Sequence, residues 1–74
     1  MSDDRFDRLV RIGFSEYEAK AYIALLRENP TTGYQLAKLS GVPRSMIYEA
    51  LGKLAARGAA MTLRKGETTH YAPV

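Results

Sequence analysis

The side chains with the most chemistry in this 74-residue sequence lie close together, just past its middle. Arg44 presents five N–H donors in a planar fork, which matches guanine O6 and N7 or the oxygens of one phosphate. The same stretch adds a hydroxyl, a phenol, a carboxylate and an ammonium group, from Ser45, Tyr48, Glu49 and Lys53. Such groups contact base edges and phosphates in nucleic-acid complexes. They indicate a binding surface, although a plain solvated helix face would carry similar residues.

Signatures of catalysis and of metal binding are missing. Ser45 stands outside a G-x-S-x-G motif, and the sequence has no glycine-rich phosphate loop. His70 is the only histidine and cysteine is absent, so a metal site would lack its usual ligands. Asp3, Asp4 and Asp7 fit the negative charge favoured at a helix N-terminus. We therefore expect no enzyme, no cofactor and no metal, with His70 as an ordinary strand residue.

The spacing of small and aliphatic residues predicts that residues 32–57 form a helix-turn-helix. Ala37 lets two helices approach closely, and Gly41 supplies the left-handed conformation that a tight turn favours. Ile47 closes the joint from the second helix, which we expect over residues 43–57. The apolar face of that helix has an i, i+3, i+4, i+7 pattern made by Ile47, Ala50, Leu51 and Leu54. Its opposite face carries the polar groups described above, where a recognition helix reads the major groove.

Two helices are expected before this unit. Residues 3–12 have one apolar stripe, made by Phe6, Leu9 and Val10. A capping box at Ser15 and Glu18 opens the second helix, which should run from residue 16 to 28 or 29, before Pro30. This helix is apolar over a wide arc, with Ala19, Ala21, Tyr22, Ile23, Leu25 and Leu26. It should therefore be the central helix, packed on two sides.

A short helix and a β-hairpin complete the expected fold. Thr32 and Gln35 form a second capping box, and the helix that follows has an expected buried side of Leu36, Ala37 and Leu39. Met61 and Leu63 then alternate with polar residues, as in a half-buried strand. A turn at 65–67 makes residues 60–72 a two-stranded wing. The expected fold class is mainly α with a small β-hairpin: a winged helix-turn-helix of three to four helices, in one domain over residues 1–74.

The charges are distributed unevenly. Residues 1–30 carry five basic and six acidic side chains, whereas residues 31–74 carry six basic and two acidic ones, a net of +4. This excess favours a polyanionic partner, although a solvated basic surface would show the same balance. The longest apolar run, residues 21–26, is too short to cross a membrane, and the first residues lack a signal-peptide core. We expect a cytoplasmic protein without a membrane partner.

Further candidate contacts flank the recognition helix. Thr32 and Gln35 begin a helix whose N–H groups and dipole favour a phosphate, with capping as the main alternative role. Lys38 adds a positive charge on the exposed side of the same helix. Arg64 and Lys65 lie at the expected wing tip, where basic residues reach the minor groove or flanking phosphates. Charge at a strand edge also prevents aggregation, and the two roles are compatible.

Several motifs together resemble the N-terminal winged-helix domain of TrmB-family transcriptional regulators. The matching segments are Ser15-x-Tyr17-Glu18-Ala19, Tyr22-x-x-Leu25-Leu26, Leu36-Ala37-x-x-Ser40-Gly41-Val42-Pro43-Arg44-Ser45-x-x-Tyr48 and Leu51-x-x-Leu54-x-x-x-Gly58. The resemblance covers residues 9–72. It implies sequence-specific binding of double-stranded DNA, in regulators of sugar metabolism and transport in archaea and bacteria. Many members of the family bind a sugar through a C-terminal domain.

The sequence also departs from this family. It stops at Val74, just after the wing, which indicates either a domain of a longer regulator or a stand-alone short protein. A sugar effector is expected only where a further C-terminal domain exists, and a homodimer is possible, for which the first helix, with its stripe of Phe6, Leu9 and Val10, could supply an interface. Ala59 and Ala60 replace a larger aliphatic residue and should loosen the first wing strand. The main alternative is a winged helix for protein assembly without DNA binding, and an RNA-binding winged helix is a weaker third reading.

Overall fold

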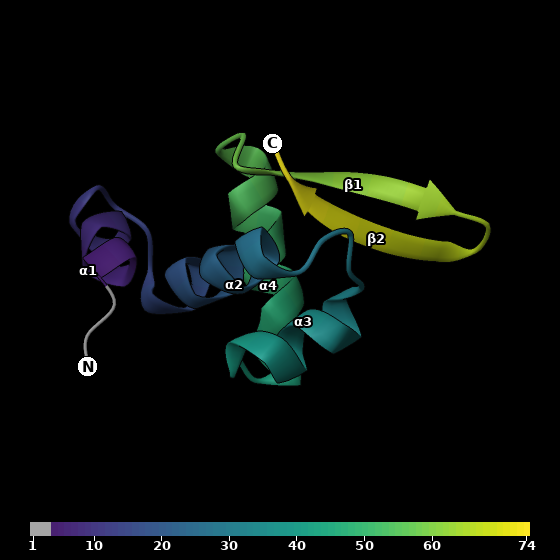
Figure 1. The fold of residues 1–74 in the computed structure, drawn as a ribbon, viewed down its shortest axis with the longest axis horizontal. Helices are drawn as coiled ribbons and strands as arrows, with labels where there is room; N and C mark the ends of the chain where they lie inside the picture. Colours follow the sequence, from purple (N-terminus) through teal and green to yellow (C-terminus); the bar gives the residue numbers. More distant parts are fainter. Residues whose placement is uncertain (1–3) are drawn as a thin grey trace.

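A computed structural model describes residues 4–74; Asp3, expected at the start of the first helix, lies outside the described residues. The chain folds into four helices followed by an antiparallel β-hairpin, which confirms the expected winged helix-turn-helix (Figure 1). The elements are α1 (Asp4–Arg11), α2 (Glu16–Arg27), α3 (Gly33–Ser40), α4 (Arg44–Ala56), β1 (Ala60–Lys65) and β2 (Thr68–Pro73). Helix α4 begins one residue later than expected, because Pro43 has an extended ψ of 143° and precedes the first helical residue.

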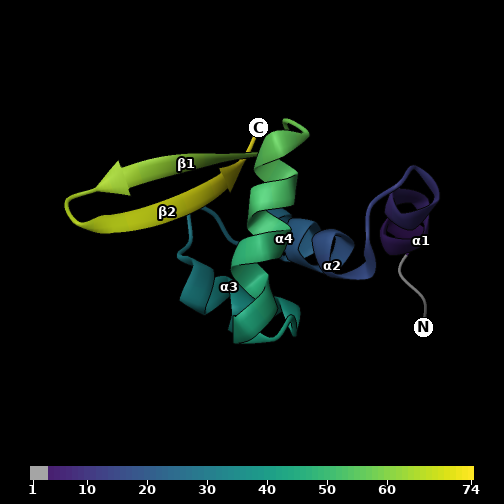
Figure 2. The same ribbon diagram turned by 180° about the vertical axis from the view of Figure 1, so that it is seen from behind.

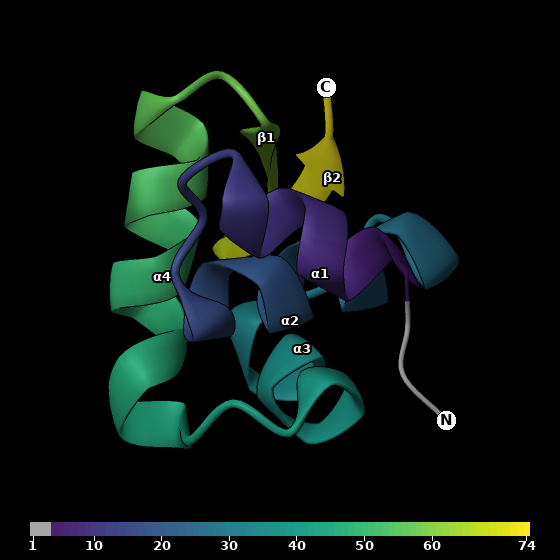
Figure 3. The ribbon, with the colours of Figure 1, turned by 90° about the vertical axis from the view of Figure 1, so that its left-hand side faces the viewer.

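Helix α2 lies at the centre of the molecule and contacts α1, α3 and α4 (Figure 3). It is central because small and aliphatic residues cover most of its circumference. The core combines its Ala19, Ala21 and Leu25 with residues of the helix-turn-helix, chiefly Leu36, Val42, Ile47, Leu51 and Leu54. This core fixes the angle between α3 and α4, and so determines which face of α4 remains exposed.

Three apolar residues expected to be buried are exposed instead. Leu39 is 51% exposed, because it lies on the opposite side of α3 from Ala37, which faces the core. Leu26 is exposed near the end of α2, where no neighbouring helix covers that side. Val10 is exposed on α1, whereas the other two residues of its expected stripe, Phe6 and Leu9, pack against the core.

The ends of the helices form largely as the sequence predicts. Thr32 and Gln35 form a complete capping box, with Gln35 N donating to Thr32 Oγ1 at 3.2 Å and Thr32 N donating to Gln35 Oε1 at 3.4 Å. Gly41 ends α3 with a φ of +79°, in the left-handed region that glycine enters at little cost. The backbone therefore makes the tight turn that brings α4 across α3.

Only half of the capping box expected at α2 forms. Ser15 Oγ accepts from Glu18 N, but the Glu18 carboxylate is buried and lies 2.8 Å from Arg57 Nη2, at the end of α4. This ion pair is close but lacks the alignment of a hydrogen bond. Arg57 also donates to Gly13 O at 3.2 Å and lies 4.1 Å from the centre of the Phe14 ring. One side chain thus ties the α1–α2 turn to the end of α4.

The hairpin projects from the helical body, as Figures 1 and 2 show. Its register runs from Ala60 opposite Pro73 to Lys65 opposite Thr68, and Thr31 extends the pairing through a bridge to Tyr71. Ala60 is buried in the core. Met61 is 45% exposed, contrary to the expected alternation, because β1 leaves the core after Ala60, whereas Leu63 and residues 69–73 of β2 remain partly buried. The wing is thus held at its base and extends freely toward its tip.

Candidate nucleic-acid interface

All the polar residues that the sequence predicted on the recognition helix lie on its exposed face: Arg44, Ser45, Tyr48, Glu49 and Lys53. They oppose the fully buried face made by Ile47, Leu51 and Leu54. Figure 2 shows α4 from this side, with α3 below it and the hairpin beside it. The part of the exposed face that carries Tyr48 lies beside the start of α3 and the wing.

The structure divides these residues into two groups. Glu49 and Lys53 form an i,i+4 ion pair, with 3.5 Å between Glu49 Oε1 and Lys53 Nζ, and they line a small hollow beside Ser15 and Tyr17 at the start of α2. Tyr48 points the other way, toward α3 and the wing. Pairing offsets the charges of Glu49 and Lys53, so these two residues are less available to a ligand than Arg44 and Tyr48.

A groove of about 490 Å³ separates the start of α3 from the hairpin, and we name it the α3–wing groove. It is lined by Thr32, Gly33, Tyr34, Tyr48, Glu67, Thr68, Thr69 and Tyr71. Glu67 is its only charged side chain among the described residues. The groove offers hydroxyl and aromatic groups beside the recognition helix. Of its lining, the sequence predicted only Thr32 and Tyr48 as binding residues.

The close contact between Gly33 and Tyr48 shapes one wall of this groove. A methyl group at Gly33 would lie 2.7 Å from Tyr48 Cζ and 2.9 Å from its Oη, too close for non-bonded atoms. Gly33 has no positive φ, so glycine matters here for the space it leaves and not for backbone conformation. The absence of a side chain lets the phenol of α4 rest on the first residue of α3.

Tyr34 connects the two basic residues that the sequence predicted on α3 and α4. Lys38 Nζ lies 4.4 Å and Arg44 Cζ 4.6 Å from the centre of its ring, within the range of cation–π contacts. The positive charge of Lys38, and to a lesser degree that of Arg44, lowers the pKa of the Tyr34 phenol below its ordinary value. This cluster could not be predicted from the sequence, because the turn must first bring α3 and α4 together.

The remaining predicted contacts lie on either side of the recognition helix. Gln35 accepts hydrogen bonds from Thr32 N and from Thr31 Oγ1, so its side-chain oxygen is committed to capping. Arg64 and Lys65 are exposed near the wing tip, where Arg64 Nη1 donates to Thr69 Oγ1 at 3.3 Å. The hairpin thereby presents two positive charges at a distance from the helical body (Figure 1).

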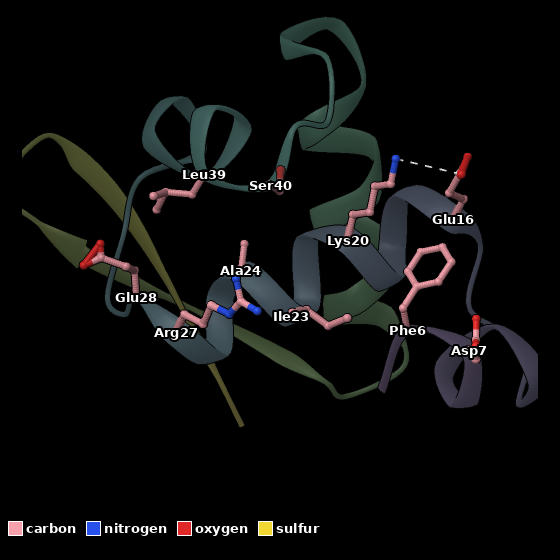
Figure 4. Close-up of a pocket in the computed structure, with 10 residues that line it drawn as sticks. All are labelled: Phe6, Asp7, Glu16, Lys20, Ile23, Ala24, Arg27, Glu28, Leu39 and Ser40. Carbon is pink, nitrogen blue, oxygen red and sulfur yellow. Dashed lines mark ion pairs between the residues drawn. The ribbon is translucent and has the colours of Figure 1, made fainter. Parts of the chain in front are cut away.

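A second groove, of about 580 Å³, lies between α1, α2 and α3, and we name it the α1–α3 groove (Figure 4). Its apolar lining comes from Phe6, Ile23, Ala24 and Leu39. Charged residues of both signs surround it, namely Asp7, Glu16, Lys20, Arg27 and Glu28. Within residues 4–74 no cluster of three His, Cys, Asp or Glu side chains could hold a metal ion, and no helix is long and apolar enough to cross a membrane.

Comparisons with known proteins agree with this geometry. Solved structures with the same fold include TrmBL2, an archaeal chromatin protein whose structure shows a novel mode of DNA binding. The match covers 99% of this chain and 28% of the TrmBL2 chain, with a TM-score of 0.80 and 40% sequence identity. The PcaV transcriptional regulator of Streptomyces coelicolor matches 92% of this chain and 58% of its own with a TM-score of 0.74. At 18% identity, PcaV shows similarity of fold alone.

Sequence relatives cover the whole chain. YrhO of Bacillus subtilis is 51% identical over 74 residues, and the sugar sensing transcriptional regulator TrmBL1 of Pyrococcus furiosus is 32% identical. The chain spans 26% of the length of YrhO and 21% of that of TrmBL1. The family model described as sugar-specific transcriptional regulator TrmB matches residues 9–74. The chain therefore belongs to the TrmB family of transcriptional regulators.

Proposed function

We propose that this chain binds double-stranded DNA in a sequence-specific manner, as the winged-helix domain of a transcriptional regulator. The observation that carries the proposal is the exposed polar face of α4, headed by Arg44 and flanked by the start of α3 and a basic wing tip. A helix presented in this way fits the major groove, which admits one α-helix. Membership of a family of transcriptional regulators supports DNA as the ligand over a protein or RNA partner.

Each element has its own role in the proposed complex. Ser45 and Tyr48 face base edges from α4, and Arg44 contacts a base or a phosphate beside them. From the wing, Arg64 and Lys65 contact the minor groove or the flanking phosphates. The start of α3, with Thr32, Gln35 and Lys38, lies against the backbone, while Glu49 and Lys53 make peripheral contacts.

Fluorescence anisotropy with a labelled duplex, titrated at several salt concentrations, tests this function. Neutralising several phosphates should make the logarithm of the binding constant fall linearly with the logarithm of salt concentration, with a slope of about −0.9 per phosphate. Lys65→Ala should reduce that slope by about one unit. Arg8→Ala is the matched control, because it also removes one positive charge, from the exposed surface of α1. Absence of binding at low salt, or equal slopes for the two variants, would contradict the proposal.

We also propose that two copies associate through the α1–α3 groove. The groove combines apolar residues with charges of both signs, so a two-fold axis could pair the patch with itself. Leu39→Lys should shift a dimer to monomer in sedimentation equilibrium. A wild-type chain that stays monomeric at high concentration would contradict this pairing.

The sugar response belongs to a separate proposal about the whole protein. The matched relatives are about four to five times as long as this chain, and one of them is named as sugar sensing. We place sugar binding in the part of those relatives that lies outside the match. Calorimetry of this chain with simple sugars should therefore detect no binding, and saturable heat with any of them would contradict the assignment.

A further inference from the structure

Tyr34 gathers two positive charges from different helices around one aromatic ring. Lys38, one turn further along α3, and Arg44, at the start of α4, both lie within 5 Å of the ring centre. Their positive groups therefore lie at most about 9 Å apart, a distance at which like charges repel each other. The negative face of an aromatic ring attracts each of them and offsets part of that repulsion.

The ring contributes little else to the fold. Tyr34 is 43% exposed and takes no part in the core cluster, whose nearest members on α3 are Leu36 and Ala37. An exposed aromatic ring in contact with two cations, and not with the core, has its main effect on those cations. Contact with the ring restricts the rotamers of Lys38 and Arg44 in the free protein. These two side chains therefore lose less conformational entropy when they bind a ligand.

We propose that Tyr34 is a positioning residue that holds Lys38 and Arg44 together as one phosphate-binding pair. The inference rests on the proposed DNA binding and makes it more specific, because it assigns Arg44 to the DNA backbone and not to a base. Two cations held by one ring, from separate helices, can each donate to one of the two non-bridging oxygens of a phosphodiester group. A guanidinium that recognises guanine must instead extend into the major groove, apart from other cations. Base recognition then falls to Ser45 and Tyr48.

Substitutions at Tyr34 separate the ring from the hydroxyl. Tyr34→Phe keeps the aromatic face and should bind DNA within about two-fold of wild type, whereas Tyr34→Leu should bind about 3- to 10-fold more weakly. The loss should be equal for specific and random duplexes, because phosphates carry no sequence. Tyr34→Leu should also reduce the salt slope by up to about two units, although it removes no charge.

A double-mutant cycle tests whether Tyr34 acts through its two neighbours. In a chain that carries Lys38→Ala and Arg44→Ala, adding Tyr34→Leu should change affinity by less than about two-fold. An undiminished effect in that background would show that Tyr34 contacts DNA itself and would overturn the proposal. So would a Tyr34→Leu variant with wild-type affinity and salt slope, or an Arg44→Ala loss confined to specific duplexes.

A measurement on the free protein distinguishes this proposal from DNA binding itself. The ring current of Tyr34 should shift the side-chain NMR signals of Lys38 and Arg44, and Tyr34→Leu should abolish those shifts while the thermal unfolding midpoint stays within about 2 °C. Retained shifts in Tyr34→Leu would overturn the positioning role even if DNA binds. Normal ring-current shifts without binding to any duplex would instead overturn the proposed function, and the phosphate role with it.

Discussion

Replacing Gly33 with alanine tests how closely α3 and α4 approach at the proposed DNA face. The added methyl group would lie 2.7 Å from Tyr48 Cζ, so one of the two groups must move. Tyr48 is 58% exposed, and its phenol is the outer end of a flexible side chain. It should therefore swing away from α3 while the two helices keep their positions.

Two opposing contributions set the change in stability. Alanine in place of glycine within a helix stabilises the fold by about 0.5–1 kcal/mol. If the displaced phenol exposes about 40–60 Å² of its ring, the loss is about 1–1.5 kcal/mol at 25 cal/mol per Å². Gly33→Ala should therefore lower the free energy of unfolding by between zero and about 1 kcal/mol, the difference between these two contributions.

Urea unfolding of a double-mutant cycle with Tyr48→Ala gives the decisive comparison. Once the ring is gone, Gly33→Ala should stabilise the chain by about 0.5–1 kcal/mol, because only the helix contribution remains. DNA affinity should fall in Gly33→Ala, since Tyr48 leaves the wall of the α3–wing groove. Equal stabilisation by Gly33→Ala in both backgrounds would refute the reasoning, because the phenol would not then occupy this space.

Three further predictions concern the fold. Arg57→Met should destabilise the chain by about 2–3 kcal/mol in urea unfolding, because it leaves the Glu18 carboxylate, which is 4% exposed, without its charged partner. Adding Glu18→Gln should recover most of that loss, and a loss below about 0.5 kcal/mol would contradict the role of the pair. Thr32→Ala should cost about 1 kcal/mol by removing the cap of α3, and unchanged unfolding would contradict it. Burial raises the pKa of Tyr71 above its ordinary value of 10.0, so the unfolded chain ionises first and stability should fall as pH rises past that value. Tyr71→Phe should flatten this decline in unfolding curves between about pH 9 and pH 11, and an unaltered decline would show that other groups cause it.

The features that depend on near neighbours in the chain could be predicted from the sequence. A capping box joins residues three apart, so Thr32 and Gln35 were recognisable without any knowledge of the fold. Gly41 was recognisable for a similar reason, because the turn it forms depends on its own backbone. The apolar period of α4 likewise identified its exposed face.

Burial depends on which elements surround a residue, and here the sequence was a weaker guide. Leu39 and Met61 followed sound apolar patterns, yet no element covers them in the described part of the chain. The carboxylate of Glu18 could not be assigned from its capping motif either. Its partner, Arg57, is distant in sequence and meets it only when α4 packs across α2.

The candidate site shows the same division. Residues of α4 were predicted from the periodicity of one helix, whereas the contributions of Gly33 and Tyr34 follow from the crossing of two. Gly33 has no backbone feature to mark it, because its role is to leave space for Tyr48. Tyr34 becomes relevant only when the turn brings Arg44 over its ring.

Mapping amide chemical shifts of the isotopically labelled chain during titration with a DNA duplex tests the central claim most directly. The account predicts that the largest changes occur at the start of α3, at residues 44–48 of α4 and at the wing tip around Arg64 and Lys65. Residues that line the α1–α3 groove should change little. Changes concentrated in that groove, or no changes with any duplex at low salt, would contradict DNA binding by the winged helix.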